Sequence, residues 1–99
     1  MTDLVEVFKA LSNSNRMKIY RMIRVRTVEI KKHSGNEKCC VGDIYKEIRI
    51  TPSTVSHHLK ELRHAGLIDM EKEGQFSHIS ANEEIFNEIK KFFDEIDEW

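Results

Sequence analysis

The chain has 99 residues, of which 39% are hydrophobic and 33% charged, the size and composition of one small soluble domain. No apolar run reaches the roughly 18 to 20 residues that a membrane-spanning helix needs, so we expect no membrane partner. The opening residues, Met1 to Asp3, lack the basic-then-apolar layout of a secretory signal, which favours a cytoplasmic protein.

Charge is distributed unevenly along the chain, although the formal net charge is only -1. Residues 1–66 contain 13 Lys and Arg against 7 Asp and Glu, whereas residues 67–99 contain 3 against 10. The local field, rather than the total charge, decides whether a domain attracts nucleic acid. A nucleic-acid-binding motif is therefore expected in the first two thirds of the chain.

Helical periodicity predicts two helices near the N-terminus. Thr2 or Asp3 can cap the first one, which covers about residues 2–11. Its apolar positions recur at helical spacing: Leu4, Val7, Phe8 and Leu11. A second helix begins near Asn15, and the pattern fails from Arg26 onward, so that Lys31 to Lys38 is expected to form a basic, polar loop.

A helix-turn-helix is predicted over about residues 42–66. Gly42 opens a short helix, and Thr51 followed by Pro52 is a typical start of the second one. Threonine can accept a free amide of the first turn, and proline has no amide to leave unpaired there. Gly66 suits the left-handed position that ends a helix. The inward face of this second helix is apolar: Val55, Leu59 and Leu62.

The remaining chain predicts a hairpin and a last helix. Two alternating segments around Gly74 indicate a β-hairpin wing over about residues 67–80. Asn82 can cap a helix over about residues 82–98, whose apolar positions are Ile85, Ile89, Phe92, Phe93, Ile96 and Trp99. The order of elements predicts a single domain over residues 1–99 that is mostly α with a β-hairpin wing (α+β), a winged helix-turn-helix.

The outer face of the helix that follows Thr51 is small and polar, with no carboxylate between residues 53 and 58. Short side chains of this kind can reach base edges in the major groove, and a helix N-terminus favours phosphate. An ordinary solvated helix face usually carries Glu and Lys instead. We therefore predict double-stranded DNA as a partner, contacted by Thr51, Ser53, Thr54, Ser56, His57, Lys60, Arg16, Lys72 and Gln75.

The chain resembles the ArsR/SmtB family of winged-helix repressors. Residues 51–68, TPSTVSHHLKELRHAGLI, are similar to the family segment S-x-S-T-V-S-H-H-L-x-x-L-x-x-A-G-L-V, and residues 11–19 to its LadptRlrIL signature. Relative to the family, Val25 to Lys38 looks like an insertion. The resemblance implies a homodimer on a partly palindromic operator. It also implies a dimer interface on the first and last helices: Leu4, Val7, Phe8, Ile89, Phe92, Phe93 and Ile96.

Metal-sensing members of that family carry ligands on the third helix, as Cys-Val-Cys-Asp-Leu, or on the last helix. Here Gly42 stands at the second cysteine of the motif, and the last helix has no His. Cys39 and Cys40 are a candidate dithiol for a soft ion such as As(III), Cd(II) or Cu(I), with His33 or a partner residue as third ligand. The alternative is that Cys40 is a small buried apolar residue and Cys39 an incidental thiol.

No nucleophile–base constellation, glycine-rich phosphate loop or metal-hydrolase motif occurs in the sequence, so we expect no enzyme activity. The prediction is a sequence-specific transcriptional regulator, a repressor that a thiol-reactive or soft-metal effector relieves. The alternative is a winged-helix protein-interaction module that works through its acidic last helix without binding DNA. His57, Glu61 and His64 also share a helix face at a spacing that suits zinc, although that stripe faces or flanks the surface offered to DNA.

Overall fold

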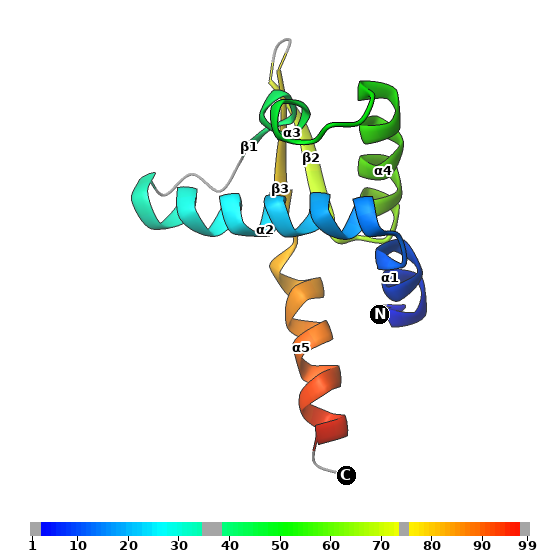
Figure 1. Cartoon of the computed structure of the whole chain (residues 1–99). Coiled ribbons are helices and arrows are strands. Elements are labelled where there is room, and N and C mark those ends of the chain that lie inside the picture. The colour runs from blue at the N-terminus through cyan, green and yellow to red at the C-terminus, as the bar shows by residue number, and fades with distance from the viewer. Residues whose placement is uncertain (1–2, 35–38, 74–75, 98–99) are drawn as a thin grey trace.

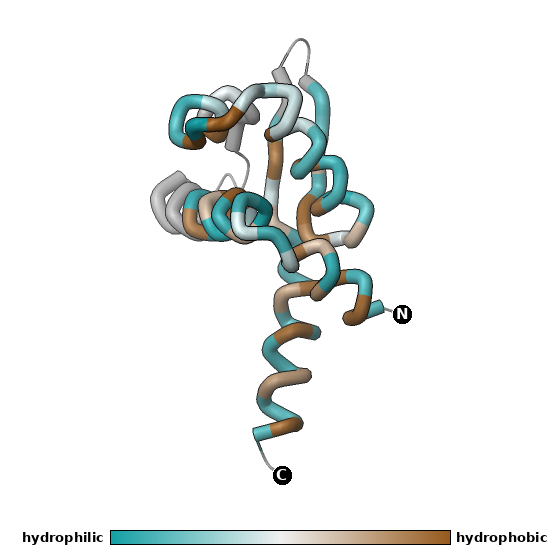
Figure 2. Tube along the Cα trace, turned by 45° about the vertical axis from the view of Figure 1, so that its right-hand side comes forward, coloured by the Kyte–Doolittle hydropathy of each residue, from teal (hydrophilic) through white to brown (hydrophobic). Residues whose placement is uncertain are grey.

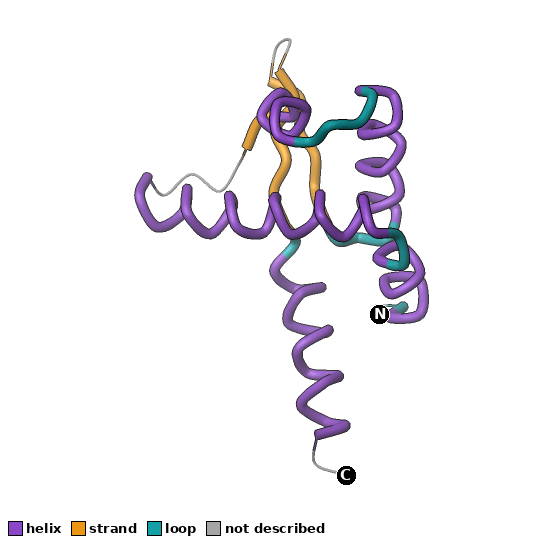
Figure 3. The backbone as a smooth tube through the Cα atoms, viewed as in Figure 1, coloured by secondary structure: helices purple, strands orange, loops and turns teal. Residues whose placement is uncertain are grey.

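The computed structural model describes residues 3–34, 39–73 and 76–97. Within these ranges the chain is mostly helical with an antiparallel hairpin, which confirms the predicted fold class (Figure 1, Figure 3). The elements in chain order are α1 Leu4–Leu11, α2 Ser14–Ser34, β1 Cys39–Cys40, α3 Val41–Glu47, α4 Pro52–His64, β2 Ile68–Glu73, β3 Phe76–Ala81 and α5 Glu83–Asp97.

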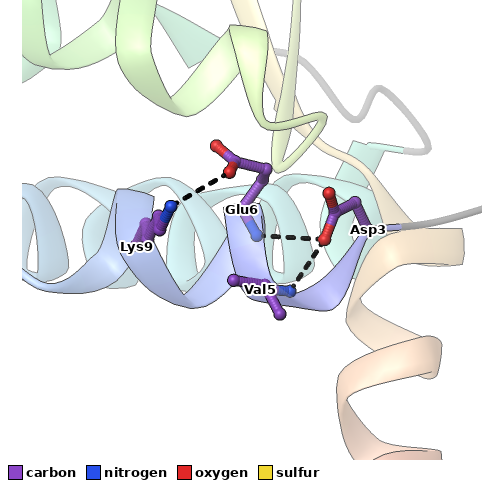
Figure 4. Close-up of polar contacts among 4 residues, drawn as sticks. All are labelled: Asp3, Val5, Glu6 and Lys9. Carbon is purple, nitrogen blue, oxygen red and sulfur yellow. Dashed lines mark hydrogen bonds and ion pairs between the residues drawn. The ribbon is translucent and has the colours of Figure 1, made fainter.

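Helix α1 begins at a side-chain cap (Figure 4). The Oδ1 atom of Asp3 accepts hydrogen bonds from the amides of Val5, at 3.1 Å, and Glu6, at 3.3 Å. These bonds satisfy two of the donors that every helix N-terminus leaves free. The ion pair of Glu6 with Lys9, at 3.4 Å, is exposed and contributes little because solvent screens it. Asp3 is thus the residue that sets the start of α1.

Helix α2 extends farther than its apolar pattern predicts. Asn13 caps it, since its Oδ1 accepts a main-chain amide three residues later at 3.0 Å. The helix continues through Ser34, so the predicted loop is wrong for residues 31–34. Residues 25–34 contain neither Gly nor Pro, and a helix can propagate there without a core-facing stripe. No helix of the described part of the chain, α2 included, is long and apolar enough to cross a membrane.

The strands form one antiparallel sheet in the order β1–β3–β2. β2 pairs with β3 along its whole length and forms the predicted hairpin. On the other side of β3, Cys39 lies opposite Ile79 and Cys40 opposite His78. Sequence patterning missed β1 because two residues are too few to show an alternation. The effect of β1 is to anchor the start of α3 against the sheet.

The core lies where α2 packs against α3 and α4 and where all three helices pack against the sheet. Its fully buried side chains are Val7, Ile19, Ile23, Ile44, Val55, Leu59, Leu62, Leu67, Ile68 and Ile79. Three of them, Val55, Leu59 and Leu62, are the predicted inward face of α4, and the prediction is confirmed. Because this stripe is fixed in the core, the opposite face of α4 must face solvent.

Gly66 ends the turn after α4 with a φ of 81°, in the left-handed region that was predicted for it. The amide of Gly66 donates to the Arg63 carbonyl and the amide of Leu67 to the Leu62 carbonyl, both at 3.0 Å. These bonds close the helix end and direct the chain into β2. A Cβ at this position would lie 3.6 Å from Ile85 Cγ1, an ordinary contact, so the backbone conformation is what requires glycine.

Helix α5 leaves the body of the molecule on the side away from α4 and the sheet (Figure 1). At its start, Glu83 Oε1 pairs with Arg24 Nη1 at 2.5 Å, and the same guanidinium lies 3.7 Å from the centroid of the Phe86 ring. None of the described residues of α5 is buried, and hydrophobic and hydrophilic segments alternate along it (Figure 2). Much of the apolar surface of α5 is therefore left exposed in the single chain.

Candidate nucleic-acid interface

The start of α4 presents an exposed polar surface. Every residue predicted there is exposed, and we call the set the recognition face: Thr51, Ser53, Thr54, Ser56, His57 and Lys60. The first turn of α4 contains no acidic residue. The acidic helix α5 extends in the opposite direction, so it leaves this face open (Figure 1). The arrangement suits a helix that enters a DNA groove by its N-terminal half.

Hydroxyl groups are linked to one another at the start of α4. Thr51 Oγ1 accepts the amide of Thr54 at 3.4 Å, and it lies 2.7 Å from Thr54 Oγ1 and 3.4 Å from Ser53 Oγ. Thr51 is thus the predicted N-cap, and Pro52 occupies the first turn. The hydroxyls gather beside the free amides of the helix, where a phosphate oxygen finds several donors together.

Tyr45 joins the recognition face from α3, which the sequence did not predict. Its hydroxyl lies 2.8 Å from Ser56 Oγ. The two residues are eleven positions apart on different helices, so no periodicity along one helix could predict the pair. Lys46, the next residue, is exposed in the last turn of α3 and adds a cation beside this edge.

Arg16, which was predicted to contact DNA, is half-buried and its guanidinium is bound within the fold. Its Nε donates to His58 Nδ1 at 3.3 Å, and its Nη1 donates to the Ala10 carbonyl at 3.1 Å. His58 is only 6% exposed. Burial lowers the pKa of His58 below its ordinary value, and the charge of Arg16 and the neighbouring His57 lower it further. The neutral imidazole can then accept the guanidinium bond, which ties α1, α2 and α4 together.

The hairpin contributes less to this surface in the described part of the chain. Lys72 is exposed on β2, and His78 is half-buried on β3. Gln75, the other predicted contact in the wing, lies outside the described residues. Lys72 is therefore the lysine through which the described hairpin can reach a phosphate.

The predicted metal ligands lie largely outside what the structure describes. Cys39 and Cys40 form β1, and their side chains are not among the described ones. Among the described residues, no group of three or more His, Cys, Asp and Glu is placed to hold a metal ion. The zinc alternative on α4 (His57, Glu61 and His64) is consequently wrong. The soft-metal site at the two cysteines stays a prediction.

An aromatic cluster of Phe8, Phe92 and Phe93 connects α1 to α5. The centroid of the Phe8 ring lies 5.5 Å from that of Phe92 and 6.2 Å from that of Phe93. The centroids of the Phe92 and Phe93 rings are 5.4 Å apart. Phe93 is 51% exposed and Ile96 46% exposed. Aromatic pairs at such distances hold the two helices together while leaving apolar surface outside.

The exposure of the α1 side chains differs in part from that of the predicted dimer interface. Val7 is 1% exposed and belongs to the core, so its assignment to the interface is wrong. Val5 on the same helix, which sequence analysis missed, is 62% exposed. Leu4 and Ile89, like Phe8 and Phe92 of the aromatic cluster, are half-buried. The exposed apolar face of α1 therefore keeps Leu4 and Phe8 and includes Val5 in place of Val7.

Comparisons with known proteins connect this arrangement to a family. The family model described as "Bacterial regulatory protein, arsR family" matches residues 34–70, which include α3 and α4. The uncharacterized HTH-type transcriptional regulator YbzH of Bacillus subtilis (strain 168) is 33% identical over 92 residues, which cover 89% of this chain and 92% of that protein. The transcriptional repressor SdpR of the same organism is 33% identical over 76 residues, covering 77% and 72%.

Solved structures show the same fold. An ArsR-like transcriptional regulator from Rhodococcus sp. RHA1 superimposes with a TM-score of 0.73 over 94% of this chain and 77% of that chain, at 19% identity. Its sequence is too distant to show more than the fold, but the sequence relatives cover most of both chains. On this evidence the chain belongs to the ArsR family of bacterial regulatory proteins.

Proposed function

We propose that this chain is a sequence-specific DNA-binding transcriptional repressor that acts in the cytoplasm as a homodimer. The observation that supports it most directly is the recognition face, an exposed and carboxylate-free surface on a helix whose opposite side is fixed in the core. Membership of a family of regulatory proteins supports DNA as the partner. The similarity to a protein named as a transcriptional repressor, SdpR, supports repression.

The proposal gives each part of the recognition face a role. The hydroxyl and imidazole groups of Ser53, Thr54, Ser56 and His57 are short enough to meet base edges in the major groove. Lys60 lies one turn farther along α4 and reaches a phosphate. Thr51 fixes the start of the helix and can share its hydroxyl with the DNA backbone, while Lys72 and Gln75 contact the backbone from the hairpin.

The homodimer follows from the exposed apolar surface on α1 and α5. Pairing two chains through Phe93, Ile96 and their neighbours covers side chains that one chain leaves in water. A two-fold axis through that interface presents the recognition faces to two major grooves about one helical turn apart. The operator is then partly palindromic, with two similar half-sites.

Selection of bound fragments from a random DNA pool tests this function. We expect enrichment of a palindromic sequence whose affinity falls steeply as salt is raised from about 50 mM to about 200 mM, because phosphate contacts release counterions. A pool without any enriched sequence, or an affinity that does not respond to salt, contradicts the proposal.

We further propose that a soft ion held by Cys39 and Cys40 relieves DNA binding. The support is the pair of adjacent thiols in β1, immediately before the helix-turn-helix. Addition of As(III), Cd(II) or Cu(I) to the protein–operator complex should release DNA from the parent protein and not from a Cys39→Ser, Cys40→Ser double variant. Equal behaviour of the two proteins contradicts this part of the proposal.

A further inference from the structure

A pocket of about 730 Å³ lies between α2 and the segment that joins α3 to α4. Its volume falls within the roughly 300–1,000 Å³ that small-molecule sites occupy in proteins. It involves none of the residues of the recognition face, the aromatic cluster or β1. The pocket is therefore a separate feature of the molecule that neither DNA binding nor dimerisation explains.

The floor of this pocket is apolar. Met22 comes from α2, and Ile48 and Ile50 come from the segment between α3 and α4; all three are half-buried and pack against the core. Val25, at the rim, is 50% exposed. A ligand with an apolar body can thus remove water from an existing hydrophobic surface without any unfolding of the chain.

The rim of the pocket is positively charged. Lys18, Arg21 and Arg49 line it and are exposed, and Arg26 lines it half-buried. The one carboxylate in the lining, Glu47, is paired with Arg26. Among the described residues, no ion pair is found for the other three cations. The rim consequently holds a surplus of positive charge that a ligand can neutralise.

We propose that this pocket binds a small organic anion with an apolar body, its acidic group against Arg21, Arg49 and Lys18 and its body on the isoleucines and Met22. A bare inorganic anion leaves the apolar floor in water, and a neutral apolar molecule leaves the cations without a counter-charge. An amphipathic carboxylate, sulfonate or phosphate satisfies both. Because the site spans α2 and the connection to α4, an occupant contacts the segment that places the recognition face.

Fluorescence titration of the full chain with 1-anilinonaphthalene-8-sulfonate tests the proposal. This probe combines an acidic group with an apolar body and becomes fluorescent in an apolar site. We expect saturable binding that an Arg21→Gln, Arg49→Gln double variant weakens at least about tenfold, the effect of one hydrogen bond to a charged group. N-phenyl-1-naphthylamine, the same rings without the sulfonate, should bind more weakly and show no difference between the two proteins.

The control variant is Lys91→Gln, which removes one positive charge from an exposed position on α5 outside the pocket. It should bind the sulfonate like the parent.

A Val25→Glu variant, which places a carboxylate at an exposed rim position without touching the core, should lose binding as the arginine variant does. The proposal is overturned if the arginine variant or Val25→Glu binds the sulfonate as tightly as the parent, or if Lys91→Gln weakens it equally. DNA binding is measured without the probe, so either proposal can fail alone.

Discussion

The bond from Arg16 Nε to His58 Nδ1 exists only while the imidazole is neutral, because a protonated histidine has no acceptor nitrogen. The pKa of His58 is lowered chiefly by burial, and Arg16 and His57 act in the same direction. The bond connects the first turn of α2 to the middle of α4. Protonation of this one side chain therefore acts on the helix that carries the recognition face.

The free energy of unfolding should depend on pH through His58. The unfolded chain titrates this residue near about 6.5, and the folded pKa is lower, so the unfolded state binds more protons in between. The stabilisation is complete above about pH 6.5 and is lost as pH falls through the folded-state pKa. Urea unfolding between about pH 8 and about pH 5 measures it. The His58→Gln variant keeps a hydrogen-bond acceptor and does not titrate at this position. Its free energy of unfolding should therefore fall less than that of the parent between these two pH values, and equal falls would argue against the mechanism.

Tyr20 is the second buried polar residue with a measurable consequence. Its hydroxyl is buried without a hydrogen-bond partner among the described residues, and burial raises its pKa. Since an unpaired buried hydroxyl has lost its water, Tyr20→Phe should raise the free energy of unfolding by about 1 kcal/mol. Urea unfolding of the two proteins provides the test. A destabilised Tyr20→Phe variant would mean that the hydroxyl has a favourable partner.

At the scale of elements, α4 was predicted well because independent signals agree on it. Thr51 caps it, Pro52 follows, the apolar stripe has helical spacing, and Gly66 ends its C-terminal turn. The same periodicity predicts that the residues of the recognition face point to solvent. Tyr45 and the Arg16–His58 bond could not be predicted, since both depend on how helices pack and not on any spacing along one helix.

The errors at this scale have a common physical cause. Helix α2 continues through Ser34, beyond the point near Arg26 where the apolar periodicity of the sequence fails. β1 consists of two residues and owes its existence to pairing with β3. Periodicity detects a repeating apolar face, so it misses a helical segment whose sequence has no such repeat and a strand too short to show one.

Two glycines should respond to alanine in opposite directions. Gly66 has a φ of 81°, which strains any residue with a Cβ, so Gly66→Ala should lower the free energy of unfolding by about 1–2 kcal/mol. Gly42 lies in α3, where a Cβ would meet nothing within 4 Å, so Gly42→Ala should raise it by about 0.5–1 kcal/mol. Thermal or urea unfolding of the pair measures both, and a shift of the same sign in both variants would refute this account of the turn.

At the scale of the whole molecule, two kinds of surface lie at opposite ends. The start of α4 and the hairpin lie at one end, and the apolar stripe of α5 extends from the other (Figure 1, Figure 2). Two lysines of the described chain lie on α5, against six carboxylates: Glu83, Glu84, Glu88, Asp94, Glu95 and Asp97. The field of the acidic helix is thereby kept away from the surface that is offered to phosphates.

Phe93→Glu tests the proposed pairing of two chains. A carboxylate in the exposed part of the aromatic cluster cannot be buried without a counter-charge, so the dimer should dissociate and operator affinity should fall with it. Sedimentation velocity measures the change in mass. Asn87→Glu, which adds the same charge at an exposed position of the same helix outside the aromatic cluster, should leave the dimer intact. A Phe93→Glu variant that remains dimeric places the interface elsewhere.

The measurement closest to the central claim compares binding of the selected operator with binding of a scrambled duplex, for the parent and for a Ser56→Ala, His57→Ala double variant. If the recognition face makes the base contacts, the variant should lose at least about tenfold of the preference for the operator, because one good base contact discriminates by about 1–3 kcal/mol. Binding to the scrambled duplex should change little. A variant that keeps the parent's ratio of the two affinities would show that another surface reads the DNA sequence.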